Sequence, residues 1–243
     1  IEAMRLAFAD AFRYVADPRQ VPVPTADLIS KDYAAGRRAL IDRARAMPLA
    51  PYGKVPVGSD TVYISCVDGQ GNACSFINSV YNNFGTGLVV PGTGIALHNR
   101  GSLFSLDPEH PNALAPGKRP YHTIIPAMAT VDGELYLCYG VMGSFFQPQG
   151  HLQVISNLVD FAMDPQQAIN ALRFMVMDDS VFLEEGLSTE VVRELQRRGH
   201  QVSVVSGYSR VGMGGAQVIM RDRDTGVLWG GSEPRKDGCA LGW

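Results

Sequence analysis

The sequence has little of the chemistry that marks metal-binding, membrane and nucleic-acid-binding proteins. Among 243 residues there are four cysteines, with no C-x-x-C pair and no histidine at metal-ligand spacing to any of them, so we expect no zinc site. No apolar run approaches the roughly 20 residues that span a bilayer. No basic run is longer than a pair such as Arg37-Arg38. We therefore expect neither a membrane nor a nucleic acid as a partner.

Familiar catalytic and nucleotide-binding motifs are also missing. The sequence contains no G-x-S-x-G elbow and no H-E-x-x-H helix. The glycine-rich string VGMGGAQ, residues 211–217, lacks the G-x-G-x-x-G spacing and precedes a predicted strand rather than a helix. The string GTGLVVPGTG lacks the Lys and Ser/Thr that end a phosphate-binding loop. We expect no nucleotide, metal or other cofactor.

Apolar residues, by contrast, are plentiful enough to form a core. Hydrophobic side chains make up 46% of the chain and the net charge is −3, which suits one sizeable core, or one large domain with an appendage. We interpret the cysteines as buried free thiols, the ordinary role of cysteine in a core. The alternative is that Cys66 and Cys74, which flank one predicted turn, face each other. The four are Cys66, Cys74, Cys138 and Cys239.

Helices and strands are predicted in separate blocks, and most strands come in pairs around short turns. This segregation indicates an α+β fold, with antiparallel sheets and helices outside them, rather than a Rossmann alternation. Helices are predicted over residues 1–17, from Thr25 or Asp27 to about 46, and over 148–163, 165–173 and 188–199. Strands are predicted over 61–68, 73–80, 123–131, 134–142, 174–184, 201–206, 215–222 and 227–230, with a short one within 84–97.

The best candidate boundary is the loop over residues 47–60, which has three prolines and two glycines. Before it, the helical pattern is already present at Ile1, with no N-cap residue in front. We therefore expect the chain to begin inside a longer protein. The compartment is not readable: a cytoplasmic location is favoured, and a periplasmic or secreted one stays open because a leader would lie upstream.

Thr61 follows this loop and opens a predicted strand. A hydroxyl is a weak nucleophile and needs an adjacent base. A threonine at a chain terminus carries its own base, because the free α-amino group has a pKa of about 7.7–8.0. Thr61 gains that amine only if the bond from Asp60 is cut. The ordinary alternative is a β-branched residue that simply suits a strand.

Several sequence strings occur in the same order as in a known family, and this resemblance strengthens the case for Thr61 as a nucleophile. The chain resembles the γ-glutamyltransferase family over essentially its whole length. The resemblance implies the fold of the N-terminal-nucleophile hydrolases, a sandwich of layers in the order α, β, β, α. The strings are DTVYISCVDGQGNACSFINSVYNNFGTGLV, GIALHNRGSLFS, PGKRPYHTIIPAM, GVMGSFFQPQGH and ALRF.

The resemblance also implies a division of the chain. Residues 1–60 resemble the C-terminal end of the large subunit, and residues 61–243 resemble the complete small, catalytic subunit. Family members cleave themselves before the threonine that begins the small subunit, so cleavage is expected between Asp60 and Thr61. The large subunit from the same precursor would be a partner, and a homo-oligomer of such heterodimers is possible. Thr61 would serve as nucleophile and, through its amine, as general base.

Three further catalytic positions follow from the resemblance. Ser79, in INSVYNNFG, lies where the family has a second hydroxyl that hydrogen-bonds the nucleophile. Gly143 and Ser144, in GVMGSFF, match the paired glycines whose backbone N–H groups form the oxyanion hole. A serine at the second place still supplies an N–H group.

The substrate pocket departs from the family pattern. Tyr81 stands near a family Asn, and His122 and Thr123 stand near two serines. Arg100 and Leu103 stand near a Gln and an Asp, and that Asp pairs with the α-ammonium of a γ-glutamyl group. Leu103 cannot make this pair, whereas Arg100 repels an ammonium and attracts a carboxylate. The alternative is that Arg100 is a solvated loop residue.

These departures resemble a branch of the family that includes oxamate amidohydrolase. We expect a self-processing N-terminal-threonine amidohydrolase that acts on a small amide with a carboxylate-bearing acyl group, with water or an amine as acceptor. Glutaryl-type acyl groups of cephalosporins also end in a carboxylate and are not separated from oxamate by these residues. A true γ-glutamyltransferase or glutathione hydrolase is the enzymatic alternative. An unprocessed, non-catalytic family member is the other.

Overall fold

The computed structural model describes residues 1–48 and 60–243, which divide into two compact units. Residues 1–48, 99–122 and 175–204 form unit 1, and residues 60–98, 123–174 and 205–243 form unit 2. The loop predicted over 47–60 lies almost entirely outside the described residues. The subunit boundary at Asp60-Thr61 concerns the covalent chain rather than these units, and it stays a prediction.

Unit 1 combines four helices and a short 3-10 helix with a three-stranded sheet in the order β5-β6-β7. The first and last residues of this sheet, Phe174 and Val205, belong to unit 2. The predicted helix from Thr25 to about residue 46 is wrong in two respects. It is broken at Ile29, because Ser30 caps a new helix by accepting the N–H of Tyr33 at 3.1 Å, and that helix ends at Ala39. The bounds are α1 Glu2–Tyr14, α2 Thr25–Leu28, α3 Lys31–Ala39, η1 Arg100–Leu103, α6 Thr189–Arg197, β5 Phe174–Met177, β6 Ser180–Glu184 and β7 Gln201–Val205.

The strand predicted over 174–184 is two strands. Asp178 has a φ of 50°, a left-handed conformation that reverses the chain between β5 and β6. Asp is among the few residues besides glycine that adopt this conformation readily, but it is a weaker turn signal than the glycines of the other hairpins.

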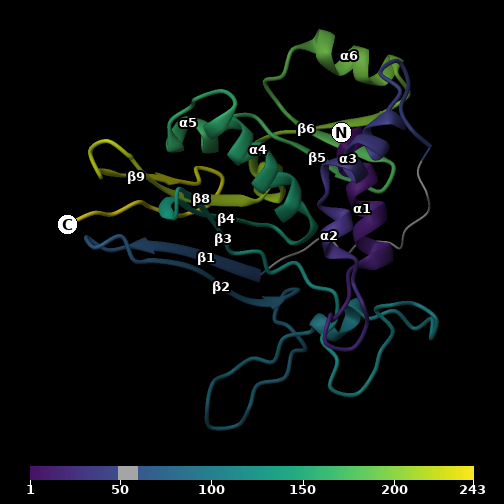
Figure 1. Ribbon diagram of the computed structural model, residues 1–243, viewed down its shortest axis with the longest axis horizontal. Coiled ribbons are helices and arrows are strands. Elements are labelled where there is room, and N and C mark those ends of the chain that lie inside the picture. Colours follow the sequence, from purple (N-terminus) through teal and green to yellow (C-terminus); the bar gives the residue numbers. More distant parts are fainter. Residues whose placement is uncertain (49–59) are drawn as a thin grey trace. The chain divides into compact units, whose positions relative to one another are not determined.

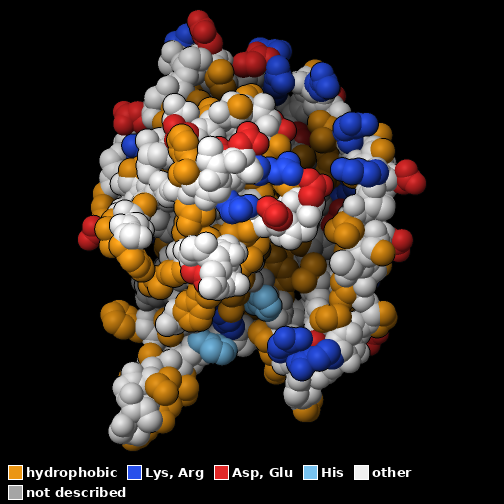
Figure 2. Space-filling view, turned by 60° about the vertical axis from the view of Figure 1, so that its left-hand side comes forward, with side chains coloured by type: hydrophobic (Ala, Val, Ile, Leu, Met, Phe, Trp, Pro, Cys, Tyr) orange, Lys and Arg blue, Asp and Glu red, His pale blue; other side chains and the backbone are white. Residues whose placement is uncertain are grey.

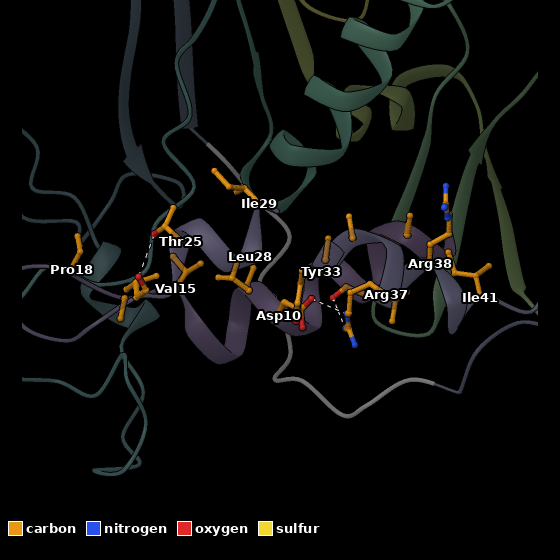
Figure 3. Close-up of a pocket in the computed structure, with 17 residues that line it drawn as sticks. Asp10, Val15, Pro18, Thr25, Leu28, Ile29, Tyr33, Arg37, Arg38 and Ile41 are labelled. Atoms are coloured by element: carbon orange, nitrogen blue, oxygen red, sulfur yellow. Dashed lines mark hydrogen bonds and ion pairs between the residues drawn. The ribbon is translucent and has the colours of Figure 1, made fainter. Parts of the chain in front are cut away.

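A groove of about 720 Å³ lies among α1, α2 and α3 of unit 1 (Figure 3). Its walls are mainly apolar, and the ion pair between Arg37 and Asp10, 2.9 Å long, lies along it. Ile29 beside it is largely exposed. None of the described residues that line this groove belongs to the predicted site.

Unit 2 contains a two-stranded hairpin, a four-stranded sheet in the order β3-β4-β8-β9, and two helices. Every strand pair in both sheets is antiparallel, as predicted. The bounds are β1 Asp60–Val67, β2 Ala73–Tyr81, β3 Ala127–Val131, β4 Glu134–Met142, η2 Ser144–Phe146, α4 Gln147–Val159, α5 Pro165–Asn170, η3 Gly207–Met213, β8 Gly215–Arg221 and β9 Leu228–Ser232.

The elements of unit 2 form three layers, with the β1-β2 hairpin and the helices on opposite faces of the four-stranded sheet (Figure 1). Gly140 of β4 faces the hairpin, since a Cβ there would lie 2.5 Å from the ring of Tyr63. The next residue, Val141, faces α4, since a Cβ at Gly150 would lie 2.6 Å from its side chain. This alternation is the pleat of a strand buried on both faces. The order hairpin, sheet, helices agrees with three of the four layers of the expected sandwich.

Local signals account for several elements of unit 2. Asp164 and Gln167 form a capping box at the start of α5, with Pro165 in its first turn, as the sequence predicts. The short strand expected within 84–97 is reduced to a bridge between Val89 and Ala96. All four cysteines are free, but only Cys138 is buried, so the expectation of four buried thiols is wrong for the other three.

Charge and hydropathy set limits on the surface. In Figure 2, Lys and Arg side chains lie among Asp and Glu side chains in the upper part of the view and along its right-hand edge, with no broad area of one sign. No helix in the described parts of the chain is long and apolar enough to cross a membrane.

Candidate active site

The hydroxyl of Thr61 lies against that of Ser79, its direct partner across the β1-β2 hairpin. The two oxygens, Thr61 Oγ1 and Ser79 Oγ, are 2.9 Å apart, which is hydrogen-bonding distance. Ser79 Oγ also accepts the backbone N–H of Tyr81 at 3.0 Å. Because a hydroxyl both accepts and donates, this arrangement lets Ser79 direct its own proton at Thr61 Oγ1. The two residues that the sequence paired are therefore in contact, while their catalytic roles stay predictions.

A β-bulge lies at the predicted scissile bond. Asp60 pairs with Tyr81 but Thr61 pairs with Ser79, so Val80 is an extra residue on β2 between these two pairs. Tyr81 has a φ of 78° and is only 1% exposed. Bulges bend a strand and redirect its side chains, and a bulky residue at positive φ needs support from its surroundings. The backbone irregularity thus coincides with the bond between Asp60 and Thr61.

Tyr63 fixes the hairpin to the four-stranded sheet. Its hydroxyl lies 2.7 Å from Ser75 Oγ, and Ser75 donates in turn to the carbonyl of Tyr139 at 3.4 Å. Burial raises the pKa of Tyr63 well above its usual range, so the phenol stays neutral. The sequence analysis did not single out Tyr63. The signal was Gly140 in an otherwise apolar strand, which indicates close approach of another element.

Gly143 and Ser144 form a tight turn between β4 and α4. Gly143 has φ 138° and ψ 34°, values open to glycine, and its carbonyl accepts the N–H of Phe146 at 3.0 Å. Ser144 has φ 54° and is buried. The turn lies immediately before α4, whose N-terminus carries the partial positive charge of the helix dipole. Such a position favours an anion, as an oxyanion hole requires.

The predicted pocket residues fall into both units. Tyr81 and Thr123 belong to unit 2 and are 1% and 2% exposed. Arg100 and His122 belong to unit 1, and Arg100 is 5% exposed, so the alternative of a solvated loop arginine is wrong. Burial, followed by the charges of Arg100 and Arg119, lowers the pKa of His122. At neutral pH Arg100 is therefore the cation of this pair and His122 a neutral donor or acceptor.

No group of three His, Cys, Asp or Glu side chains within residues 1–48 and 60–243 is placed to hold a metal ion. The arrangement in unit 2 is instead one of hydroxyls and backbone N–H groups. This chemistry suits attack on a carbonyl by an oxygen nucleophile.

Comparison with known proteins agrees with this reading of the geometry. A sequence model of the family described as gamma-glutamyltranspeptidase matches residues 1–243. The glutathione hydrolase-like YwrD proenzyme of Bacillus subtilis is 39% identical over all of this chain and 46% of its own length. The oxamate amidohydrolase proenzyme of Klebsiella pneumoniae is 37% identical over the same shares. The chain therefore spans less than half the length of the curated relatives that it matches.

A solved structure gives the same result for the fold. The crystal structure of cephalosporin acylase from Bacillus halodurans superposes on this chain with a TM-score of 0.91 and 47% identity, over 100% of this chain and 44% of that one. Gamma-glutamyltranspeptidase from Pseudomonas nitroreducens superposes with a TM-score of 0.66 at 28% identity. The predicted α+β fold of N-terminal-nucleophile hydrolases is confirmed.

Proposed function

Since the chain belongs to the γ-glutamyltranspeptidase family, we propose that its precursor cleaves itself between Asp60 and Thr61 and then acts as an amide hydrolase. Cleavage frees the α-amine of Thr61, which takes the proton of the Thr61 hydroxyl while Oγ1 attacks the carbonyl carbon of the substrate. The N–H groups of Gly143 and Ser144 hold the developing oxyanion. Collapse expels the amine with a proton and leaves an ester at Oγ1, which water hydrolyses to the acid and free Thr61.

The observation that carries this proposal is the 2.9 Å contact between Thr61 Oγ1 and Ser79 Oγ. A nucleophilic hydroxyl needs one defined orientation, and two constraints supply it. The β-methyl of threonine restricts rotation about its side-chain bond, and Ser79 is itself fixed by the N–H of Tyr81. Together these two constraints leave the Thr61 hydroxyl few orientations.

The substrate we propose is a small amide whose acyl group bears a carboxylate, as in oxamate. Arg100 supports this choice because it is a buried cation, and a buried cation favours an anionic partner. Leu103 supports it because leucine offers nothing to the α-ammonium of a γ-glutamyl group. A relative that matches the whole of this chain is named for oxamate hydrolysis.

We also propose that the chain works together with the rest of its precursor. The relatives are proenzymes about twice as long as this chain, so more than half of such a protein lies outside the matched part. A large subunit from the same precursor would complete the substrate pocket and cover apolar side chains that are exposed here.

The test uses the full-length precursor, as wild type and as Thr61→Ala. Intact mass and a denaturing gel should show wild type as two fragments, one of which begins at Thr61, and the variant as one uncut chain. Ammonia release from oxamate should depend on Thr61 and exceed the aniline release from a γ-glutamyl anilide.

Three results would count against the proposal. A wild-type precursor that stays intact supports the unprocessed, non-catalytic alternative. A processed enzyme that prefers the γ-glutamyl anilide supports a γ-glutamyltransferase. Oxamate hydrolysis that persists in Thr61→Ala places the nucleophile elsewhere.

A further inference from the structure

Two arginines and one glutamate form a buried ionic cluster in unit 2. The carboxylate of Glu233, which follows β9, is 2.8 Å from Arg173 and 2.7 Å from Arg235. All three side chains are at most 2% exposed. Taking charges out of water is unfavourable unless they are paired and fully hydrogen-bonded. A buried cluster of this kind therefore raises the question of which part of the fold it holds in place. The catalytic steps proposed above use none of these three residues.

The cluster holds one short stretch of backbone at two points. Arg173 Nη1 donates to the carbonyl of Met213 at 2.9 Å and to that of Gly214 at 3.4 Å. Glu233 Oε2 accepts the N–H of Ala216 at 2.8 Å. Residues 213–216 are therefore fixed by charge-assisted hydrogen bonds at both ends, which are stronger than neutral ones.

This stretch packs directly on the turn that contains Gly143. A Cβ on Gly143 would lie 3.1 Å from the Cα of Gly214. A Cβ on Gly214 would lie 2.5 Å from the ring of Phe146 and 2.7 Å from the carbonyl oxygen of Met142. Gly214 has a φ of 75°, so both glycines use conformations that other residues rarely adopt. Residues 142–146 thus pack against residues 213–216, whose backbone the ionic cluster fixes.

We infer that Arg173 is a positioning residue for the oxyanion hole, acting through the carbonyls of Met213 and Gly214. This inference rests on the proposed role of Gly143 and Ser144. An oxyanion hole requires N–H groups fixed to within a fraction of an ångström, and both residues have positive φ, which the surroundings must maintain. A planar guanidinium presents five N–H donors spread over three nitrogens, whereas an ammonium presents three on one nitrogen and cannot reach all of these separate partners.

Arg235 provides a matched control within the same cluster. It pairs with the same carboxylate and is equally buried, but its other bonds run to the carbonyls of Ile169 and Ala171 at the end of α5. Arg173 also reaches Ile169, at 3.2 Å. The two arginines therefore differ chiefly in the bonds from Arg173 to Met213 and Gly214.

The experiment compares Arg173→Lys with Arg235→Lys in the full-length protein. Each variant keeps its charge and loses a buried guanidinium, so both should lower the melting temperature. Only Arg173→Lys should speed hydrogen exchange at the amides of residues 142–146. It should also lower kcat for Thr61-dependent hydrolysis by about 10- to 100-fold with KM unchanged, the effect of a slightly misplaced catalytic group.

Equal exchange at residues 142–146 in the two variants would overturn the inference, whatever the activity. If Arg173→Lys does not fold, Gly214→Ala leaves the cluster in place and presses on Phe146 and Met142, and it should produce the same two effects. Gly214→Ala with wild-type exchange at 142–146 would also overturn it. A wild type with no Thr61-dependent turnover would refute the proposed function, while the exchange comparison would still test the role of Arg173.

Discussion

Ser79 Oγ lies 2.9 Å from Thr61 Oγ1 and simultaneously accepts the N–H of Tyr81, two residues further along β2. The hydrogen bond from Tyr81 fixes the position of Ser79 Oγ and leaves its hydroxyl able either to donate to Thr61 Oγ1 or to accept from it. The hairpin itself therefore restricts the orientation of the Thr61 hydroxyl. This relationship leads to the first of four predictions.

Ser79→Ala should lower the rate of Thr61-dependent hydrolysis by about 10- to 100-fold, the range expected for losing one partly buried hydrogen bond to a reacting group. Ser79→Thr keeps the hydroxyl and should retain most of the rate. Ser75→Ala is the control, because Ser75 is also on β2 but contacts Tyr63 rather than Thr61. Steady-state kinetics on the processed enzyme measure all three. A Ser75→Ala enzyme as slow as Ser79→Ala would show that the effect comes from the hairpin in general.

Arg100→Ala should reduce kcat/KM for oxamate by about 10- to 100-fold, because it removes a charge-assisted hydrogen bond to a carboxylate. Arg119→Ala is the control: Arg119 is 59% exposed, pairs with Asp17, and also lowers the pKa of His122. Removal of either positive charge should raise the pKa of His122, measured by NMR titration of its ring protons. Oxamate turnover that both variants lose equally would argue against a carboxylate clamp at Arg100.

The free energy of unfolding should decrease as the pH falls below about 6.5, the usual pKa of histidine. Burial lowers the pKa of His151, and it is also the main cause of the lowered pKa of His122 and of His200. The folded state then binds these protons less readily than the unfolded state, so the stability is complete above the unfolded pKa and is lost below it. Urea unfolding between pH 5 and pH 8 measures the slope, which should be smaller in His151→Asn. An unchanged slope in that variant would exclude His151 as a contributor.

Gly140→Ala should destabilise the protein by about 1–3 kcal/mol, because the added Cβ would lie 2.5 Å from the buried ring of Tyr63. Gly69→Ala is the control, since nothing lies within 4 Å of a Cβ there and its backbone conformation is not strained. That change should be neutral or stabilising by up to about 1 kcal/mol. Thermal and urea unfolding compare the two. Equal effects at both glycines would mean that Tyr63 can move aside.

Local patterns in the sequence predicted most of the elements correctly. Two strand-like runs on either side of GQGN, residues 69–72, predicted the hairpin that carries Thr61, and Asp164 before Pro165 predicted the start of α5. The single long helix from Thr25 was wrong because the cap at Ser30 is a short signal inside an otherwise continuous apolar pattern. The strand over 174–184 was wrong because Asp178 makes the turn without a glycine.

The candidate site likewise contains residues that the sequence predicted and residues that only the structure reveals. Thr61, Ser79, Gly143 and Ser144 were predicted because ordered strings resemble a known family. The cluster of Arg173 and Glu233 was not found, because its members are far apart in the sequence and nothing local distinguishes a buried charge from a solvated one. The spacing of the glycines in VGMGGAQ excluded a phosphate loop but gave them no other role. The structure shows that Gly214 among them packs against Gly143.

The bulge between Asp60 and Thr61 has a consequence for the order of events during maturation. Three described features that hold the Thr61 side chain lie after the proposed scissile bond: the hydrogen bond to Ser79, the anchor of Tyr63 and the turn that joins β1 to β2. Asp60 still pairs with Tyr81, but the register shifts between Asp60 and Thr61, so the regular pairing of the hairpin begins at Thr61 itself. A hairpin built in this way can release its leading peptide and keep its reacting oxygen where it was, so the newly made terminus would be ready without refolding.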